Sequence, residues 1–242
     1  IEAMNIIGVD FHSVGNHEFD RGVDELKRKQ SGGCERLAGA MEPCRAGHRF
    51  KGAKFRILAA NVIDRATGQP IFPAYAIKTF EGVRIGFIGL TLKGTDQIVD
   101  PTGIRSVEFR DEATTINARA AELRGQGVNA IVVLIHEGGY AKGRLNDMSC
   151  PGLSGDILPI LDKLDPGIDV VASAHTHQPY TCDYHDLLLT SAASYGRLVT
   201  DIDLTLDRRS GRVVGKTAVN RIVTAEGYGT VAPAAAYPLV PE

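Results

Sequence analysis

Apolar residues gather along this chain in short runs that alternate with more polar, helix-forming stretches. The runs are rich in Val, Ile and Leu, and they cover residues 57–60, 83–90, 128–135 and 168–173. Continuous apolar runs of this length are typical of strands buried on both faces, as in a parallel sheet. Residues 74–80, which precede Glu81-Gly82, predict the first arm of a hairpin with 83–90.

Two helices are predicted between these strands, and a β-rich part follows them. The segment 111–124 begins with Asp111, which can cap a helix, and its apolar residues fall on one face. The segment 155–164 predicts a second helix, and strand-like stretches separated by turns occupy 178–219. This order predicts an α/β fold, a sandwich with mixed β-sheets flanked by helices.

The chain of 242 residues has room for one large domain. We assign residues 1–224 to it. Residues 225–242 are rich in Ala, Gly and Pro and show no periodicity, so we interpret them as a linker or tail. Charged residues make up 23% of the chain and the net charge is −2, without a basic run. We therefore expect no nucleic-acid polymer as partner and no membrane insertion.

Four cysteines are present, and none forms a CxxC pair, which argues against a zinc ribbon or a thioredoxin-like site. Four cysteines allow three pairings. Cys34 and Cys44 bracket a short polar loop, and Cys150 opens a Pro-Gly loop before Cys182, so we predict disulfides 34–44 and 150–182. The alternative is four free thiols in a cytosolic enzyme. Two disulfides imply an oxidising compartment.

Three loops follow apolar runs and carry residues of the kinds that bind metal ions. They are 15–20 (Gly-Asn-His-Glu-Phe-Asp), 136–139 (His-Glu-Gly-Gly) and 174–177 (Ala-His-Thr-His). In an open α/β sheet, loops at the carboxyl ends of the strands build the binding site. One histidine at a strand end is more often structural than a ligand, but three such loops favour a site. Imidazole and amide or carboxylate oxygens suit Zn, Mn, Fe or Co.

The same loops resemble the motifs of the calcineurin-like metallophosphoesterase superfamily, in particular those of its 5′-nucleotidase family. Residues 15–20 are similar to the GNHEFD form typical of the nucleotidases, and His136 resembles the histidine of the family's third block. Residues 174–177 are similar to its GHTH motif, with alanine replacing glycine. Further stretches that resemble the family are 58–61, 88–91 and 190–196.

This resemblance implies a metal-dependent hydrolase of phosphate monoesters. It implies that Asn16, His136 and His175 bind the second of two divalent transition-metal ions (Zn, Mn, Fe or Co) and that His177 binds the first. In such sites the ions lie about 3.5–4 Å apart and activate water for in-line attack on phosphorus. The sequence contains no GxSxG, Walker or GxGxxG motif that would favour another chemistry.

The resemblance also implies two catalytic residues that are not metal ligands. His17 would stabilise charge on the transferring phosphoryl group or protonate the leaving oxygen, and Asp20 would hold its imidazole protonated and oriented. An alternative role for Asp20, compatible with the first, is to cap a helix that begins at Gly22. Glu18 is expected to have a structural or supporting role.

Part of the family pattern has no counterpart in its expected place. The family has an early Asp-x-His and a bridging Gly-Asp before the Gly-Asn-His-Glu motif. Asp10-Phe11-His12 spells Asp-x-His, but it lies too close to Asn16 for the intervening strand, helix and aspartate. We interpret it as part of the strand that leads to Gly15. The domain is therefore expected to be incomplete at its start, with partial or no metal occupancy and weak or no activity.

Three functions remain open at this point. The first is hydrolysis of nucleotide-like phosphate monoesters by a 5′-nucleotidase-type enzyme, periplasmic or secreted, whose intact form has a further C-terminal substrate-binding domain. The second is a non-catalytic remnant of the same fold. The third is a related 2′,3′-cyclic phosphodiesterase or 3′-nucleotidase, which would share every motif. The expected partner is a small phosphate ester or nucleotide.

Overall fold

The computed structural model describes residues 1–34, 44 and 48–223. Its elements are α1 (Glu2–Ile7), β1 (Phe11–Ser13), η1 (Asn16–Phe19), α2 (Gly22–Ser31), β2 (Arg56–Leu58), β3 (Val62–Asp64), β4 (Tyr75–Phe80), β5 (Val83–Thr91), η2 (Lys93–Gln97), η3 (Pro101–Ile104), β6 (Val107–Phe109), α3 (Glu112–Gly125), β7 (Ala130–His136), α4 (Leu158–Leu161), β8 (Val170–Ser173), β9 (Pro179–Tyr184), β10 (Leu187–Ala192), β11 (Leu198–Leu206) and β12 (Val213–Ile222). The predicted linker or tail, 225–242, lies outside the described residues.

A mixed sheet of six strands forms the centre of the fold, in the order β4-β5-β7-β8-β10-β9. Its four inner strands are parallel, and an antiparallel strand lies at each edge. Central strand β7 is buried along most of its length, which explains its unbroken apolar sequence. The predicted hairpin is present as β4 and β5.

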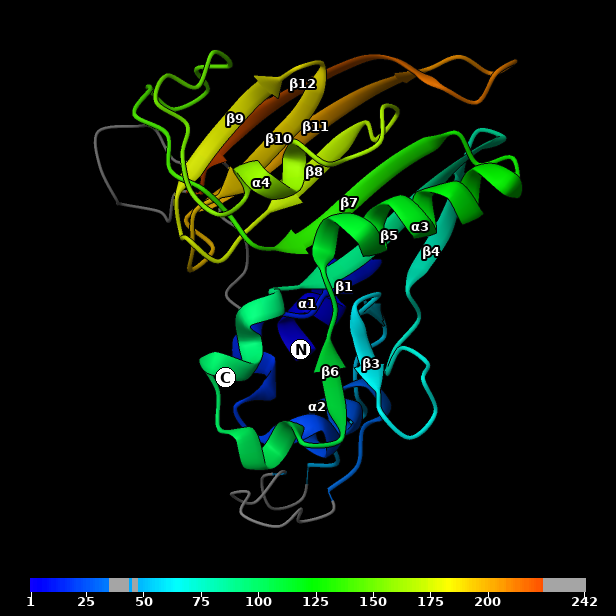
Figure 1. Ribbon diagram of the computed structural model, residues 1–242, viewed down its shortest axis with the longest axis vertical. Coiled ribbons are helices and arrows are strands. Elements are labelled where there is room, and N and C mark those ends of the chain that lie inside the picture. The colour runs from blue at the N-terminus through cyan, green and yellow to red at the C-terminus, as the bar shows by residue number, and fades with distance from the viewer. Residues whose placement is uncertain (35–43, 45–47, 224–242) are drawn as a thin grey trace.

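The two faces of this sheet are covered by different elements. On one face, Ile131 and Val133 of β7 pack with Ile116 and Leu123 of α3. On the other face, Val132 packs in a cluster that includes residues of β11 and β12. Figure 1 shows this sandwich as the upper part of the molecule, with β1, β3, β6 and α2 in the lower part. The α/β sandwich expected from the sequence is confirmed.

The two predicted helices differ in outcome. The first, α3, begins as predicted, because the Asp111 carboxylate accepts a hydrogen bond from the Thr114 backbone N–H at 2.9 Å. The predicted helix 155–164 is largely wrong, since α4 covers only Leu158–Leu161. Gly155 has a φ of 108°, which a helix cannot contain, and Pro159 lacks the N–H for a bond further back.

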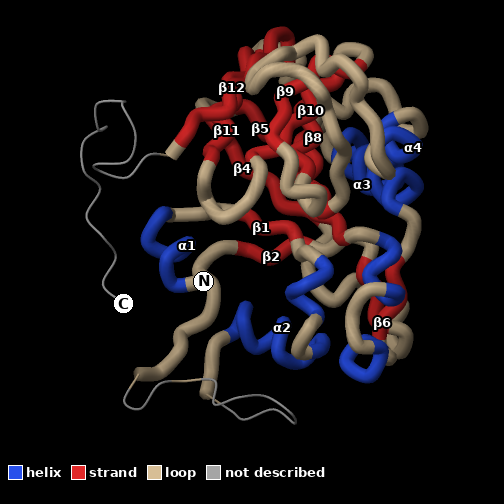
Figure 2. The backbone as a smooth tube through the Cα atoms, turned by 90° about the vertical axis from the view of Figure 1, so that its left-hand side faces the viewer, coloured by secondary structure: helices blue, strands red, loops and turns tan. Residues whose placement is uncertain are grey.

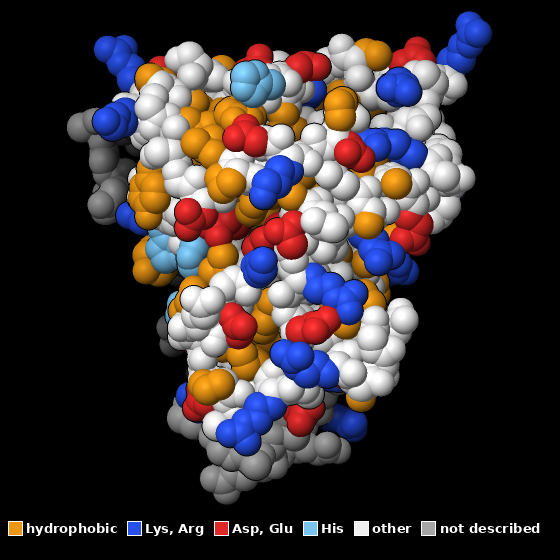
Figure 3. Space-filling view, in the orientation of Figure 1, with side chains coloured by type: hydrophobic (Ala, Val, Ile, Leu, Met, Phe, Trp, Pro, Cys, Tyr) orange, Lys and Arg blue, Asp and Glu red, His pale blue; other side chains and the backbone are white. Residues whose placement is uncertain are grey.

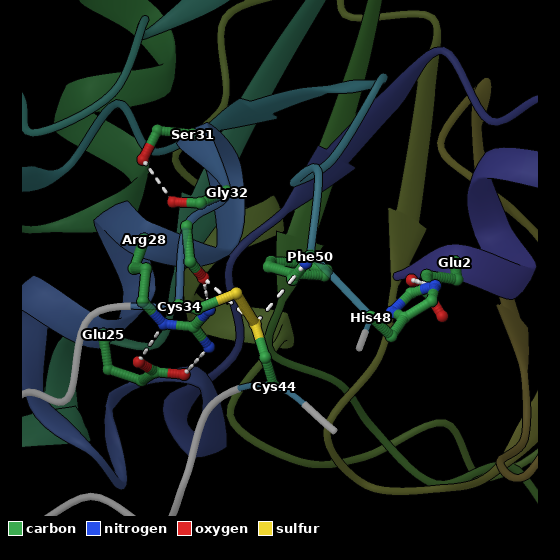
Figure 4. Close-up of a disulfide and its surroundings, with 10 residues drawn as sticks. Glu2, Glu25, Arg28, Ser31, Gly32, Cys34, Cys44, His48 and Phe50 are labelled. Carbon is green, nitrogen blue, oxygen red and sulfur yellow. Dashed lines mark hydrogen bonds and ion pairs between the residues drawn. A yellow bond between two sulfur atoms is a disulfide. The ribbon is translucent and has the colours of Figure 1, made fainter. Parts of the chain in front are cut away.

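Both predicted disulfides are present, Cys34–Cys44 and Cys150–Cys182. Figure 4 shows the first beside the ion pair of Glu25 and Arg28. The second joins the segment that follows β7 to strand β9. Each closes a loop that would otherwise be free in the unfolded chain, and so each stabilises the fold mainly by restricting that state.

Candidate metal centre

The three predicted ligand loops meet at one edge of the structure. Strands β5, β7 and β8 run parallel in register, with Thr91 paired to His136 and Ile135 paired to Ser173. The His-Glu-Gly-Gly and Ala-His-Thr-His loops therefore leave the sheet side by side. Strand β1 lies against β5 and β7. Figure 2 shows β1 and β2 below the strands of the larger sheet.

A buried threonine fixes the loop that carries Asn16. The Thr91 hydroxyl donates to the Val14 carbonyl at 2.8 Å, and the Asn61 amide exchanges two bonds with the Thr91 backbone, at 2.7 and 2.9 Å. Asn61 and Thr91 are both fully buried. They lie in the segments 58–61 and 88–91 that resemble the nucleotidases, so this network explains why those segments matter to the site.

Asn16, His136 and His175 come together at this edge. Oδ1 of Asn16 lies 2.8 Å from Nε2 of His136, and the rings of His136 and His175 are 5.2 Å apart between centroids. Gly15 makes the approach possible, because a Cβ there would lie 2.8 Å from Cε1 of His136. Asn16 is buried, so its amide oxygen is directed at its partner and not at solvent.

The Ala-His-Thr-His loop has an unusual backbone. His175 and His177 both have positive φ, 66° and 58°, a conformation that costs a non-glycine residue about 1–3 kcal/mol. The loop is held by Thr176, whose hydroxyl donates to the Gly139 carbonyl at 2.8 Å. His177 contacts the ring of Tyr195, with centroids 5.7 Å apart. His177 thus lies next to the loop that follows β10 and carries Tyr195.

His17 and Asp20 form the predicted pair. Nδ1 of His17 lies 3.0 Å from Oδ2 of Asp20, and both side chains are substantially exposed. Asp20 does not cap the following helix, whose N-cap is Arg21 without a side-chain bond. Glu18 accepts a hydrogen bond from the Gly15 backbone N–H at 2.8 Å, so its carboxylate holds the turn.

Burial keeps the two clustered imidazoles neutral. It lowers the pKa of His136 from 6.5 to about 4, and the neighbouring His175 adds to this effect. Burial also lowers the pKa of His175, followed by the effects of His177 and His17. Neutral imidazoles are the form that binds metal ions, so both rings are ready ligands at neutral pH. Burial also raises the pKa of Glu137, beside His136, to about 7.

The Asn16 and His136 donors are spaced to bind one divalent transition-metal ion. Atoms 2.8 Å apart can both bind an ion at about 2.0–2.2 Å, as the Asn16 and His136 donors would. Within residues 1–34, 44 and 48–223, no three His, Cys, Asp or Glu side chains are grouped so that they could hold a metal ion. The candidate site is not such a group, because one of its donors is the side-chain amide of Asn16.

Asp10 and His12, which spell Asp-x-His, are engaged elsewhere. Asp10 forms an ion pair with Lys78 of β4. The His12 ring packs edge-on against Phe55, 5.8 Å between centroids, and burial lowers its pKa. His12 lies in β1, paired with Ile57 of β2, as expected for the strand that leads to Gly15.

The chain is similar to known phosphoesterases in sequence and in fold. No family model matches the chain. It is 35% identical over 218 residues to a Bacillus subtilis protein named endonuclease YhcR, covering 90% of this chain and 17% of that protein. It is 28% identical over 179 residues to a 5′-nucleotidase of Vibrio parahaemolyticus, covering 74% of this chain and 28% of that protein. The chain thus spans less than a third of the length of each of these two relatives.

A solved structure shares the fold. The calcineurin-like phosphoesterase YfkN from Bacillus subtilis superposes with a TM-score of 0.69 at 21% identity, over 90% of this chain and 65% of that one. At that identity the likeness shows the fold. The relatives named 5′-nucleotidase support assignment of the chain to the 5′-nucleotidase family of the calcineurin-like metallophosphoesterase superfamily. Asn16, His136 and His175, which the sequence predicts as metal ligands, lie together at one edge of the sheet.

Proposed function

We propose that the chain is the metal-binding part of a hydrolase that removes phosphate from nucleotide-like monoesters. The observation that carries this is the meeting of Asn16, His136 and His175, beside the pair of His17 and Asp20. The family of the chain adds support, since a relative over 74% of its length is named a 5′-nucleotidase. An ion bound by the three donors would polarise a phosphoryl oxygen and lower the barrier to attack.

The protein's own residues supply the remaining chemistry. His17 is exposed and lies near enough to His175 to lower the pKa of that imidazole. Protonated, it would donate to a phosphoryl or leaving oxygen through Nε2 while Asp20 holds Nδ1. Asn16, His136 and His175 would bind the ion, and His177 would contribute to a second one.

The described residues provide only part of a two-metal site. Glu18 and Asp20, the carboxylates of the first loop, are hydrogen-bonded to the Gly15 backbone N–H and to His17. A second ion would have His177 as its one imidazole ligand among these loops. We therefore infer that the 242 residues by themselves bind one ion and hydrolyse phosphate esters slowly or not at all.

Calorimetric titration tests the proposal. Mn²⁺ is titrated into the metal-free chain, and AMP is then titrated into the chain with and without Mn²⁺. We expect one Mn²⁺ per chain and AMP binding only when Mn²⁺ is present. No Mn²⁺ binding, or equal AMP binding in both states, would contradict the proposal. His185→Ala serves as control, because His185 lies in the exposed turn between β9 and β10.

A second candidate substrate is the phosphodiester bond of a nucleic acid. It is favoured by the 35% identity to the protein named endonuclease YhcR. Against it, acidic and basic side chains are interspersed on the face shown in Figure 3, without a basic stripe there. The same titration with a single-stranded DNA oligonucleotide separates the two. Tighter binding of the oligonucleotide than of AMP would favour the nuclease.

The two disulfides support a periplasmic or secreted location, because such bonds persist in oxidising compartments. No helix among the described residues is long and apolar enough to cross a membrane. Quantifying free thiols in denatured, unreduced protein isolated from its native source tests the location. We expect close to none, whereas four reactive thiols would contradict export.

A further inference from the structure

A buried hydrogen-bond chain connects the two histidine loops, and Tyr180 of β9 is at its centre. The Gly139 backbone N–H donates to the Tyr180 hydroxyl at 3.0 Å. The Tyr180 hydroxyl lies 2.6 Å from Oγ of Ser173, which donates to the Thr190 carbonyl at 2.8 Å. Tyr180 is only 3% exposed and Ser173 8%, so water does not compete for these bonds.

In this series of hydrogen bonds, the donor and the acceptor of each bond can be assigned. Ser173 has one hydroxyl proton and gives it to Thr190, so the Tyr180 hydroxyl must donate to Ser173 and accept from Gly139. Each hydroxyl in the chain both donates and accepts. Buried hydrogen bonds of this kind favour one arrangement, because breaking one of them leaves a buried polar group unpaired.

The two ends of the network lie close to the two histidines. Gly139 follows His136 by three residues, and Ser173 precedes His175 by two. The paired register of β7 and β8 ends at Ile135 and Ser173, so the strand ladder stops before the histidine pair. The loops beyond it are joined by few contacts, including the bond from the Ala174 N–H to the Glu137 carbonyl at 3.2 Å.

Close packing makes these few contacts sensitive to small shifts. A Cβ at Gly138 would lie 2.1 Å from the Ala174 carbonyl oxygen, so the two loops are in direct backbone contact. A shift of Gly139 relative to Ser173 therefore moves one loop along the other. The spacing of the histidine rings would change with it.

We propose that the Tyr180 hydroxyl is a positioning group that sets the spacing between His136 and His175. It acts through Gly139 and Ser173 and touches neither the metal ion nor the substrate. The proposal rests on the metal centre proposed above. Its geometric part, the contact between the two rings, is a property of the metal-free chain and can be tested without metal.

The test compares Tyr180→Phe with Tyr184→Phe. Both tyrosines lie in β9 and both lose only a hydroxyl, but that of Tyr184 bonds to the exposed Asp162. In the metal-free proteins, the nuclear Overhauser effect between the ring protons of His136 and His175 is measured. Zn²⁺ affinity is then measured well below the unfolding temperature. We expect Tyr180→Phe to weaken the ring contact and to lower Zn²⁺ affinity about 10–100-fold.

The outcomes separate this inference from the proposed function. An unchanged ring contact and a Zn²⁺ affinity within about twofold of the control would overturn the inference, even if the unfolding temperature fell. If the unmodified chain binds no Zn²⁺, the proposed function fails. The ring contact in Tyr180→Phe then decides the inference alone, a weakened contact supporting it and an unchanged one overturning it.

Discussion

Nε2 of His136 lies 2.8 Å from Oδ1 of Asn16, although 120 positions separate the two residues in the chain. The contact joins the end of central strand β7 to the short helix η1 that follows β1. The contact is a tertiary one and is not formed within a single helix, turn or hairpin. The contact depends on Thr91, which holds Val14 against β5, and on Gly15, which leaves space for the imidazole.

Gly15→Ala tests the second of these conditions. The new Cβ would lie 2.7 Å from Oε2 of Glu18 and 2.8 Å from Cε1 of His136, so at least one side chain must move. We expect a loss of about 1–3 kcal/mol in the free energy of unfolding and weaker Mn²⁺ binding. Gly94→Ala is the control, because its Cβ would meet nothing within 4 Å. Equal behaviour of the two variants would contradict the packing argument.

His17 and His175 have different roles in this account, and their alanine variants should differ accordingly. His17→Ala should leave Mn²⁺ affinity within about twofold, since His17 is no ligand, and should weaken AMP binding to the loaded chain. His175→Ala should lower Mn²⁺ affinity on the order of 100-fold, more than the loss of a supporting residue. Calorimetric titration of both ligands measures each effect. If His17→Ala instead lowered Mn²⁺ affinity and His175→Ala did not, the assignment of His175 as the ligand and His17 as a substrate-binding residue would be wrong.

The depressed pKa of His136 predicts a pH-dependent stability. Its pKa is about 4 in the folded protein and near 6.5 in the unfolded chain. Between these values the unfolded state binds a proton that the folded state excludes, so the free energy of unfolding falls as the pH drops from 6.5 to 4. We expect this group to contribute about 2–3 kcal/mol to that fall.

Urea unfolding at pH 7 and pH 4.5 measures the effect in metal-free protein. His136→Gln should lose this part of the pH dependence, whereas His185→Gln should retain it. A nuclear magnetic resonance titration of the His136 ring protons gives the pKa directly. A midpoint near 6.5 in the folded protein would contradict the buried, neutral state of this imidazole.

The Cys150–Cys182 bond closes a loop between the end of β7 and strand β9. Replacing both cysteines by serine should lower the free energy of unfolding by about 2–4 kcal/mol. The variant should also bind Mn²⁺ more weakly, because the bridged segment 150–182 includes the Ala-His-Thr-His loop. Urea unfolding and metal titration check both effects. An unchanged unfolding free energy would contradict a structural role for the bridge.

The sheet was predictable because its strands are buried on both faces. Strands β5, β7 and β8 are short, mostly apolar runs, and the N-cap of helix α3 is Asp111, as predicted. The length of α4 was not predictable from its apolar residues. Gly155 and Pro159 limited that helix, and the segment around it is held by contacts with the loop after β7 instead.

The meeting of the three motif loops was predictable, but the hydrogen bonds that support them were not. Loops after parallel strands converge, so three motifs far apart in sequence could be expected to meet. The buried hydrogen bonds of Asn61, Thr91 and Tyr180 join segments that are distant in sequence, so no local sequence pattern predicts them. The left-handed backbone of His175 is likewise set by neighbouring loops and not by its residue type.

The most direct test of the account is the position of a bound metal ion. Crystals of the chain soaked in Mn²⁺, or grown with it, give an anomalous difference map in which the ion is located independently. We predict a peak about 2.0–2.2 Å from Oδ1 of Asn16, Nε2 of His136 and a ring nitrogen of His175. A peak at Asp10 and His12, or none at saturating Mn²⁺, would contradict the assignment of this metal centre.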